Sequence, residues 1–155
     1  MINKEDIELI VYDFDGVMTD NRAYIFEDGR EAVCVNRSDG LAISLFKKHN
    51  INQLILSTEK NPVVSKRAEK LGIPVLQGQP DKKQALTEYC KMNTILLLHV
   101  VYIGNDINDL EVMQNVGMPC CPSDAVSDIK AISNYCFISK GGDGVIRELY
   151  DQLYK

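Results

Sequence analysis

The chain has 155 residues, an apolar content of 45% and a formal net charge of -5, so it is long enough to form a domain with a hydrophobic core. The negative charge argues against nucleic acid as a partner. The first ten residues are too charged for a signal peptide, and the longest apolar stretch, 95–103, is too short to span a bilayer. We therefore expect a single domain over residues 1–155, located in the cytoplasm and not bound to a membrane.

The cysteine pattern also fits the cytoplasm. The five cysteines are an odd number, and none forms a Cys-x-x-Cys pair. We interpret them as buried, reduced thiols and not as a zinc site. They are Cys34, Cys90, Cys120, Cys121 and Cys136.

Strand-like apolar segments alternate with helix-like segments along the chain, which is typical of a parallel sheet covered by helices on both faces. A first strand is expected over 7–12, followed by a β-hairpin from 23–26 and 32–35. Nothing before Asp39 is long enough for a cap domain. The sequence thus predicts an α/β fold with a doubly wound, Rossmann-like parallel sheet, a small hairpin insertion and no cap. Further strands are expected over 53–56, 73–76, 100–103, 118–121 and 135–138, and helices over 39–48, 62–71, 81–91, 106–116, 124–133 and 145–154.

The first strand leads directly into two carboxylates, in the string Asp13-Phe14-Asp15-Gly16. Residues i and i+2 of a strand point to the same face, so Asp13 and Asp15 should start on one side, with Phe14 in the core. Gly16 allows the chain to turn away there. Two like charges this close repel each other, and a cation between oxygen ligands, such as Mg²⁺, removes the repulsion. The alternative is a strand followed by an acidic loop.

Two further candidates follow later strands, where doubly wound sheets bind their ligands. Ser57 comes directly after the strand expected over 53–56, and its hydroxyl can hold a phosphate oxygen together with nearby backbone N–H groups. Lys82 lies at the start of a helix, and its ammonium can neutralise Asp13 and the oxygens of a transferring phosphoryl group. Taken alone, Ser57 also fits a simple turn and Lys82 a solvated surface charge.

These residues give the chain a resemblance to a known family. The string Asp-Phe-Asp-Gly-Val-Met-Thr-Asp at 13–20 resembles the first motif of the haloacid dehalogenase-like phosphohydrolases. More narrowly, it is similar to their small capless branch, which dephosphorylates 3-deoxy-D-manno-octulosonate 8-phosphate and 2-keto-3-deoxynononate or N-acylneuraminate 9-phosphates. It also resembles the C-terminal domain of some acylneuraminate cytidylyltransferases. The string at 77–82 resembles the third motif and favours Lys82 over Lys83, and the string at 104–109 resembles the fourth.

The resemblance implies a Mg²⁺-dependent phosphomonoesterase that acts on a sugar phosphate. Asp13 would be the nucleophile that forms an aspartyl-phosphate. Asp15 would protonate the leaving sugar oxygen and then deprotonate the attacking water. Ser57 and Lys82 would hold the phosphoryl oxygens and offset the developing charge.

The fourth motif departs from the commoner Gly-Asp-Asp pattern, because its first acidic position is Asn105. An amide oxygen ligates Mg²⁺ without adding charge. Two interpretations stay open: Asn105 completes the metal site with Asp13 and Asp15, or Asp106 makes that contact. Asp109 is expected to orient Lys82 without contacting the metal itself. An acidic helix N-cap is the simpler alternative for this segment.

Substrate choice depends on the residues after Ser57. Octulosonate phosphatases of the family usually have Thr-Gly-Arg there, whereas phosphatases of nine-carbon 2-keto sugars can have glutamate. This chain has Thr58, Glu59 and Lys60, which we expect to contact the substrate. The sequence therefore favours a nine-carbon, sialic-acid-like 9-phosphate, with octulosonate 8-phosphate second. A helix-capping role for Glu59 is equally compatible with the sequence.

Residues 140–148 resemble the Gly-Gly-x-Gly-x-x-Arg-Glu tail of the family, which in relatives often completes the site of a neighbouring subunit in a tetramer. Gly142 and Arg147 are therefore expected to bind substrate, Arg147 through the sugar carboxylate. The resemblance implies a homotetramer. A non-catalytic oligomerisation domain is the alternative of a different class, and Asn105 is the one residue that favours it. A phosphomutase is disfavoured because a cap domain is lacking.

Overall fold

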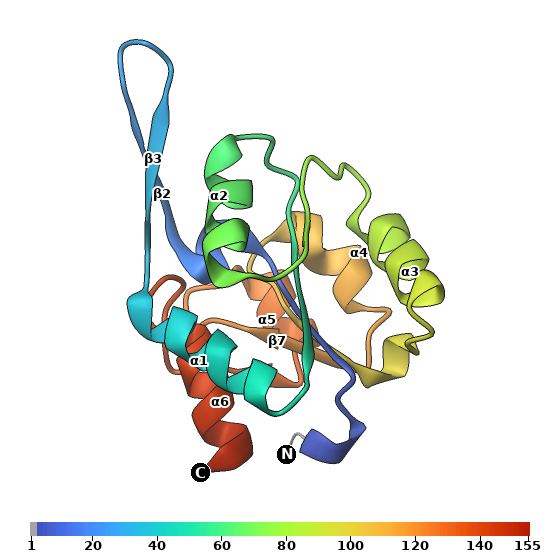
Figure 1. Ribbon diagram of the computed structural model, residues 1–155. Helices are drawn as coiled ribbons and strands as arrows, with labels where there is room; N and C mark the ends of the chain where they lie inside the picture. Colours follow the sequence, from blue (N-terminus) through green and yellow to red (C-terminus); the bar gives the residue numbers. More distant parts are fainter. Residues whose placement is uncertain (1–2) are drawn as a thin grey trace.

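The computed structural model describes residues 3–155 (Figure 1). Its centre is a six-stranded sheet with the order β5-β4-β1-β6-β7-β8, in which all neighbouring strands are parallel. A two-stranded antiparallel hairpin, β2-β3, projects away from the sheet (Figure 1). The predicted fold class, a doubly wound parallel sheet with a hairpin insertion, is confirmed.

The bounds of the elements follow the chain. The strands are β1 (Leu9–Tyr12), β2 (Thr19–Ile25), β3 (Glu31–Val35), β4 (Asn52–Leu56), β5 (Val75–Leu76), β6 (Val100–Ile103), β7 (Met118–Cys121) and β8 (Tyr135–Cys136). The α-helices are α1 (Arg37–Lys48), α2 (Pro62–Leu71), α3 (Lys82–Met92), α4 (Leu110–Met113), α5 (Ser127–Ile132) and α6 (Val145–Tyr154). Short 3-10 turns lie at Lys4–Asp6, Leu97–His99 and Ile107–Asp109, and a wide turn lies at Phe14–Met18.

Strand β1 is central because every one of its residues is apolar and buried. A strand that is covered on both faces needs such a continuous apolar run. Successive side chains alternate between two cores: Ile10 and Tyr12 pack with α1, α2 and α6, whereas Leu9 and Val11 pack with α3, α4 and α5. Each large apolar side chain that is fully buried stabilises the fold by about 1.5–3 kcal/mol.

Capping residues set where two of the helices begin or end, largely as the sequence predicts. Asn61 accepts a hydrogen bond from the N–H of Val63, Pro62 occupies the first helical position, and Gly72 ends α2 in a left-handed conformation. Helix α3 begins at Lys82, one residue later than expected, because the side chain of Asp81 caps it.

Several predicted elements are shorter in the structure. The helix expected over 106–116 is a 3-10 turn followed by the single turn of α4, because Asp106 and Asp109 form a capping box that fixes the tighter turn. The helix expected over 124–133 spans only α5. The strand expected over 135–138 ends at Cys136, because the N–H groups of Ile138 and Ser139 donate to the carboxylate of Glu148 instead of extending the sheet. The strands expected over 7–12 and 73–76 are also shorter, as β1 and β5.

The interpretation of the cysteines is wrong for two residues. Cys90, Cys120 and Cys121 are buried, but Cys34 on the hairpin and Cys136 on the edge strand β8 are exposed. All are free thiols. No helix within residues 3–155 is both long enough and apolar enough to cross a membrane.

Candidate active site

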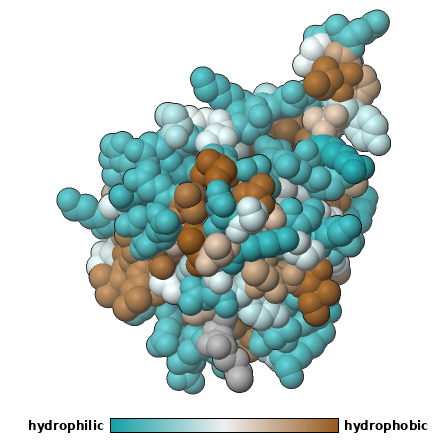
Figure 2. Space-filling model, turned by 180° about the vertical axis from the view of Figure 1, so that it is seen from behind, coloured by the Kyte–Doolittle hydropathy of each residue, from teal (hydrophilic) through white to brown (hydrophobic). Residues whose placement is uncertain are grey.

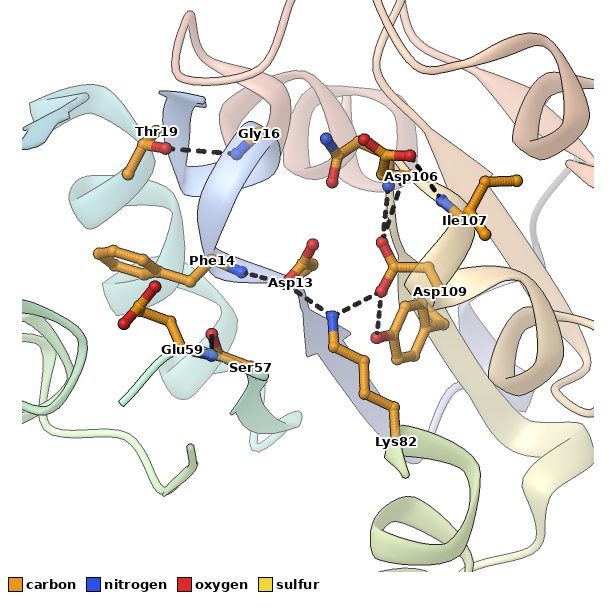
Figure 3. Close-up of polar contacts among 12 residues, drawn as sticks. Asp13, Phe14, Gly16, Thr19, Ser57, Glu59, Lys82, Asp106, Ile107 and Asp109 are labelled. Atoms are coloured by element: carbon orange, nitrogen blue, oxygen red, sulfur yellow. Dashed lines mark hydrogen bonds and ion pairs between the residues drawn. The ribbon is translucent and has the colours of Figure 1, made fainter. Parts of the chain in front are cut away.

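The candidate site lies at the carboxyl ends of β1, β4 and β6, where Asp13, Ser57, Lys82 and Asp109 come together (Figure 3). Strand β1 has β4 on one side and β6 on the other, and the strand order reverses between β1 and β6. This reversal opens the crevice in which doubly wound sheets bind ligands.

Asp13 follows β1 directly and is held from both sides. Its N–H donates to the carbonyl of Ile103 at the end of β6, at 2.9 Å. Its Oδ1 accepts the N–H of Phe14 at 2.8 Å, while the ring of Phe14 is fully buried in the core. The next turn is fixed by Thr19, whose hydroxyl oxygen accepts the N–H of Gly16 at 3.2 Å (Figure 3).

Position 16 requires glycine. Its φ is +85°, and a Cβ there would lie 2.0 Å from the terminal amide group of Asn105. Glycine therefore lets the first motif turn sharply while the Asn105 side chain lies against its backbone.

Asp15 is half-buried at the edge of this turn. Burial raises the pKa of Asp15, and the nearby charges of Glu59 and Glu31 raise it further against the opposing effect of Lys82. A raised pKa keeps a larger share of the carboxyl group protonated near neutral pH, which suits a group that donates a proton.

Lys82 joins the first and fourth motifs. Its Nζ lies 2.8 Å from Asp13 Oδ1 and 2.7 Å from Asp109 Oδ1, and the exposed fractions of the three side chains are 1%, 6% and 0%. Burial alone would lower the pKa of Lys82, but the two carboxylates outweigh it and the pKa is raised. Burial and the charge of Asp109 raise the pKa of Asp13, although Lys82 opposes them. Two carboxylates thus face one ammonium, which leaves the cluster negative.

Asp109 is the most heavily hydrogen-bonded of these groups. Besides Lys82, its Oδ1 accepts the hydroxyl of Tyr102 at 2.8 Å. Its Oδ2 accepts the N–H of Asn105 at 2.9 Å and, at 3.4 Å, that of Asp106. These donors fix the carboxylate at the position from which it meets Lys82, as the sequence predicts for Asp109.

The donor set around Asn105 fits a hard cation. The terminal amide group of Asn105 ends 3.0 Å from Asp13 Oδ2 and 2.9 Å from the main-chain oxygen of Asp15. With its nitrogen toward them, the amide donates two hydrogen bonds. With its oxygen toward them, three oxygen atoms converge on one point, which only a cation stabilises, and oxygen ligands suit Mg²⁺.

Asp106 and Ser57 have clear local partners. Asp106 Oδ1 accepts the N–H of Ile107 at 2.7 Å and so caps the 3-10 turn. Ser57 follows β4, is buried, and its hydroxyl oxygen accepts the N–H of Glu59 at 3.1 Å. The hydroxyl hydrogen of Ser57 is left to donate to another acceptor.

The three residues after Ser57 lie at the mouth of the site. Thr58 and Lys60 are exposed, and Glu59 is half-buried. Glu59 Oε1 accepts the N–H groups of Lys60 and Asn61, each at 2.9 Å, at the entry to α2. A structural role for Glu59 at the start of α2 therefore matches the structure, because one of its carboxylate oxygens binds the backbone just before the helix, whose N-cap is Asn61.

Gly142 and Arg147 are not brought to Asp13 within one chain. The N–H of Gly142 donates to the carbonyl of Val17 at 2.9 Å, so this glycine holds the turn of the first motif through a backbone hydrogen bond. Arg147 lies on α6, and its Nε is paired with Asp151 Oδ1 at 3.1 Å.

Two structural contributions were missed from the sequence. The sequence predicts Tyr102 only as part of a strand and gives Thr19 no role beyond its place in the first-motif string. The signal for Tyr102 was its polar atom in an otherwise apolar strand run, because a buried hydroxyl needs a partner.

Known proteins are similar to this chain over nearly its whole length. A family model described as haloacid dehalogenase-like hydrolase matches residues 1–149. The 3-deoxy-D-manno-octulosonate 8-phosphate phosphatase of Salmonella typhi is 33% identical over 154 residues, which are 99% of this chain and 82% of the relative.

Solved structures agree with this family. A Streptomyces avermitilis protein assigned to the same hydrolases superposes with a TM-score of 0.96 at 44% identity, covering 99% of this chain and 88% of that chain. The 3-deoxy-D-manno-octulosonate 8-phosphate phosphatase of Moraxella catarrhalis, solved with magnesium, phosphate and the sugar acid, has a TM-score of 0.91 at 31% identity, covering 95% of this chain and 85% of that chain. The chain therefore belongs to the haloacid dehalogenase-like hydrolases and, with these relatives, to their phosphatase branch.

Proposed function

We propose that the protein is a magnesium-dependent phosphomonoesterase that hydrolyses the phosphate ester of a 2-keto-3-deoxy sugar acid. The observation that carries this proposal is the buried contact of Lys82 with both Asp13 and Asp109, beside the oxygens of Asp13 and Asp15. The alternative of a surface lysine and an acidic loop does not explain this burial, because removing these charges from water is costly unless they have a function or a partner.

In the first step, a carboxylate oxygen of Asp13 attacks phosphorus while the bond from phosphorus to the sugar oxygen breaks. Asp15 donates its proton to that leaving oxygen, which its raised pKa favours. Lys82 and the free hydroxyl hydrogen of Ser57 stabilise the phosphoryl oxygens. In the second step, Asp15 removes a proton from water, and the water oxygen displaces the Asp13 carboxylate and releases inorganic phosphate.

Magnesium, held by the side chains of Asp13 and Asn105 and the main-chain oxygen of Asp15, would supply positive charge for the phosphoryl oxygens. We assign this place to Asn105 and not to Asp106, since Asp106 caps the following turn.

The substrate class follows from the relatives, which are phosphatases of an eight-carbon sugar acid. The nine-carbon preference expected from Glu59 is supported less well, because one oxygen of its carboxylate binds backbone N–H groups. We therefore place 3-deoxy-D-manno-octulosonate 8-phosphate first and a sialic-acid-like 9-phosphate second, favoured by the glutamate at position 59.

The test is phosphate release from both sugar acid phosphates, with magnesium and with a chelator. We expect turnover of at least one of them that stops when the metal is removed. Lys82→Met should abolish it, whereas Lys83→Met should not, because Lys83 pairs only with Glu111 in an exposed position. If a panel of sugar phosphates released no phosphate, the non-catalytic alternative would replace this proposal.

We also infer that the protein works as a homotetramer. The projecting hairpin carries apolar side chains that stay largely exposed in the described part of the chain: Tyr24 and Ile25 are each 74% exposed and Phe26 is 50% exposed. The space-filling view shows hydrophobic atoms on this projection (Figure 2). Exposed apolar groups gathered on one projection are typical of a protein–protein contact.

The assembly is tested with Ile25→Glu, and with Leu98→Glu as a control of similar exposure (73%) located outside the hairpin. Light scattering should show a tetramer for the wild type and for the control, and a smaller species for Ile25→Glu. The KM for the sugar phosphate should rise with dissociation, since Arg147 then has no neighbouring site to reach. A wild-type monomer with full activity would contradict the tetramer.

A further inference from the structure

We propose that Tyr102 is a positioning residue for phosphoryl transfer: its hydroxyl holds Asp109 so that Lys82 stays shared between Asp109 and Asp13. The proposal rests on the proposed phosphatase function and deepens it. Tyr102 itself touches no reacting atom, and its effect passes through the Asp109 carboxylate.

The position of Tyr102 follows from strand register. It lies in β6 opposite Val11 of β1, and both side chains belong to the core beneath α3, α4 and α5. Tyr102 is fully buried, and the residues packed around it are largely apolar. Its hydroxyl donates to Asp109 Oδ1 at 2.8 Å.

The donors around Asp109 explain why this hydroxyl matters. Tyr102 and Lys82 share the same oxygen, Oδ1, at 2.8 and 2.7 Å. A hydrogen bond from the hydroxyl satisfies part of the negative charge on Oδ1, which weakens the pull of that oxygen on the ammonium. If the Tyr102 hydroxyl is removed, Asp109 Oδ1 loses this donor and keeps its contact with Lys82, so the ammonium should move toward Asp109.

The ammonium of Lys82 has three N–H donors. One is directed to Asp13 Oδ1 at 2.8 Å and one to Asp109 Oδ1, so the third is available for a phosphoryl oxygen. A shift toward Asp109 would misplace that third donor and lengthen the contact with Asp13. Since small misplacements of groups that meet the reacting phosphate lower the rate strongly, the loss should appear in kcat.

The hydroxyl stays a donor under assay conditions. Burial, followed by the charges of Asp109 and Asp13, raises the pKa of Tyr102 well above its usual value of 10.0. The phenol is therefore protonated throughout the neutral range, and its role is geometric.

The chain contains a matched control in Tyr12. Tyr12 is also fully buried and lies on the neighbouring strand β1, and its hydroxyl donates to Gln53 Oε1 at the same distance of 2.8 Å. However, Tyr12 packs in the opposite core, and its partner is a neutral amide that does not contact Lys82. Tyr12→Phe and Tyr102→Phe thus remove the same atom from equally buried sites.

The experiment measures kcat and KM of the two variants and the wild type with the sugar acid phosphate that the wild type hydrolyses, together with their thermal unfolding midpoints. Both variants should unfold at lower temperature by similar amounts, because each loses one buried hydrogen bond. Tyr102→Phe should lower kcat about tenfold, in the range of a hydrogen bond to a charged group, with KM within about twofold of the wild type. Tyr12→Phe should keep kcat within about twofold.

A second measurement separates positioning from general packing. In the background of Asp109→Asn, the additional change Tyr102→Phe should lower kcat by less than about twofold, because the carboxylate through which it acts is gone. Equal kcat values for Tyr102→Phe and Tyr12→Phe would overturn the proposal, as would full additivity with Asp109→Asn. A wild type that hydrolyses no sugar phosphate would overturn the proposed function and this proposal with it.

Discussion

The substitution Asn105→Asp tests the proposed metal site most directly, because it changes one charge at constant size. The terminal amide group of Asn105 lies 3.0 Å from Asp13 Oδ2 and 2.9 Å from the main-chain oxygen of Asp15. An aspartate would replace a neutral donor with a second carboxylate at that distance. The substitution should therefore destabilise the protein without metal and strengthen magnesium binding.

The size of the effect follows from the distance. Two unit charges 3 Å apart repel by about 5–6 kcal/mol at an effective dielectric constant of about 20. The new carboxyl group avoids this repulsion by taking up a proton, which costs about 4 kcal/mol at pH 7 for a group whose ordinary pKa is about 3.9. We expect a loss of about 2–4 kcal/mol without metal, or about 5–15 °C in the unfolding midpoint of a chain of this length.

Differential scanning calorimetry with EDTA and with excess magnesium measures this loss, and isothermal titration measures the affinity. Magnesium should restore most of the lost stability of Asn105→Asp and bind it at least about tenfold more tightly than the wild type, because an anionic ligand has been added. Asn108→Asp, which adds the same charge at an exposed position, is the control and should change neither quantity much. An unchanged midpoint in EDTA together with unchanged or weaker magnesium binding would show that position 105 does not touch the metal.

Three other predictions concern single side chains. Asp13→Asn should abolish turnover while circular dichroism stays that of the wild type, and Asp20→Asn, at an exposed position of the same motif, should stay active. Burial raises the pKa of Asp39 to about 6. The contribution of Asp39 to the free energy of unfolding should therefore increase by about 2–3 kcal/mol as the pH falls from above 6 to below 4. In urea unfolding, Asp39→Asn should lack this pH dependence of the free energy of unfolding. Glu59→Arg should raise kcat/KM for the eight-carbon substrate relative to the nine-carbon one if the other oxygen of Glu59 meets the sugar. Equal losses on both substrates would restrict Glu59 to its backbone contacts before α2.

The sequence alone predicts which residues of the candidate site lie close together, because these residues come directly after strands. Asp13, Ser57 and the fourth motif each come directly after a strand, and the carboxyl ends of parallel strands meet at one edge of the sheet. Helix capping predicts α2 in the same local way, from Asn61, Pro62 and Gly72. These features depend only on residues close together in the chain.

Other features depend on packing between distant segments, so local patterns do not predict them. The extent of β8 is set by Glu148 on α6, whose carboxylate takes the N–H groups that would continue the strand. The exposure of Cys136 depends on β8 being an edge strand, and the orientation of Arg147 depends on Asp151 one helical turn away. A sequence pattern also says nothing about which of several acceptors a buried hydroxyl such as that of Tyr102 will find.

The charge balance of the site links Asn105 to the stability of the fold. Asp13 and Asp109 are buried around one ammonium, and the hydroxyl of Tyr102 and backbone N–H groups meet part of the remaining negative charge. With an aspartate at position 105, a third carboxylate would join them, and the fold would depend on the bound cation to hold the site together. A neutral amide that donates to Asp13 removes that dependence, because it stabilises the same carboxylate without metal. If Asn105 holds magnesium as proposed, the amide should bind the cation more weakly than an aspartate would and keep the site assembled when the cation is absent.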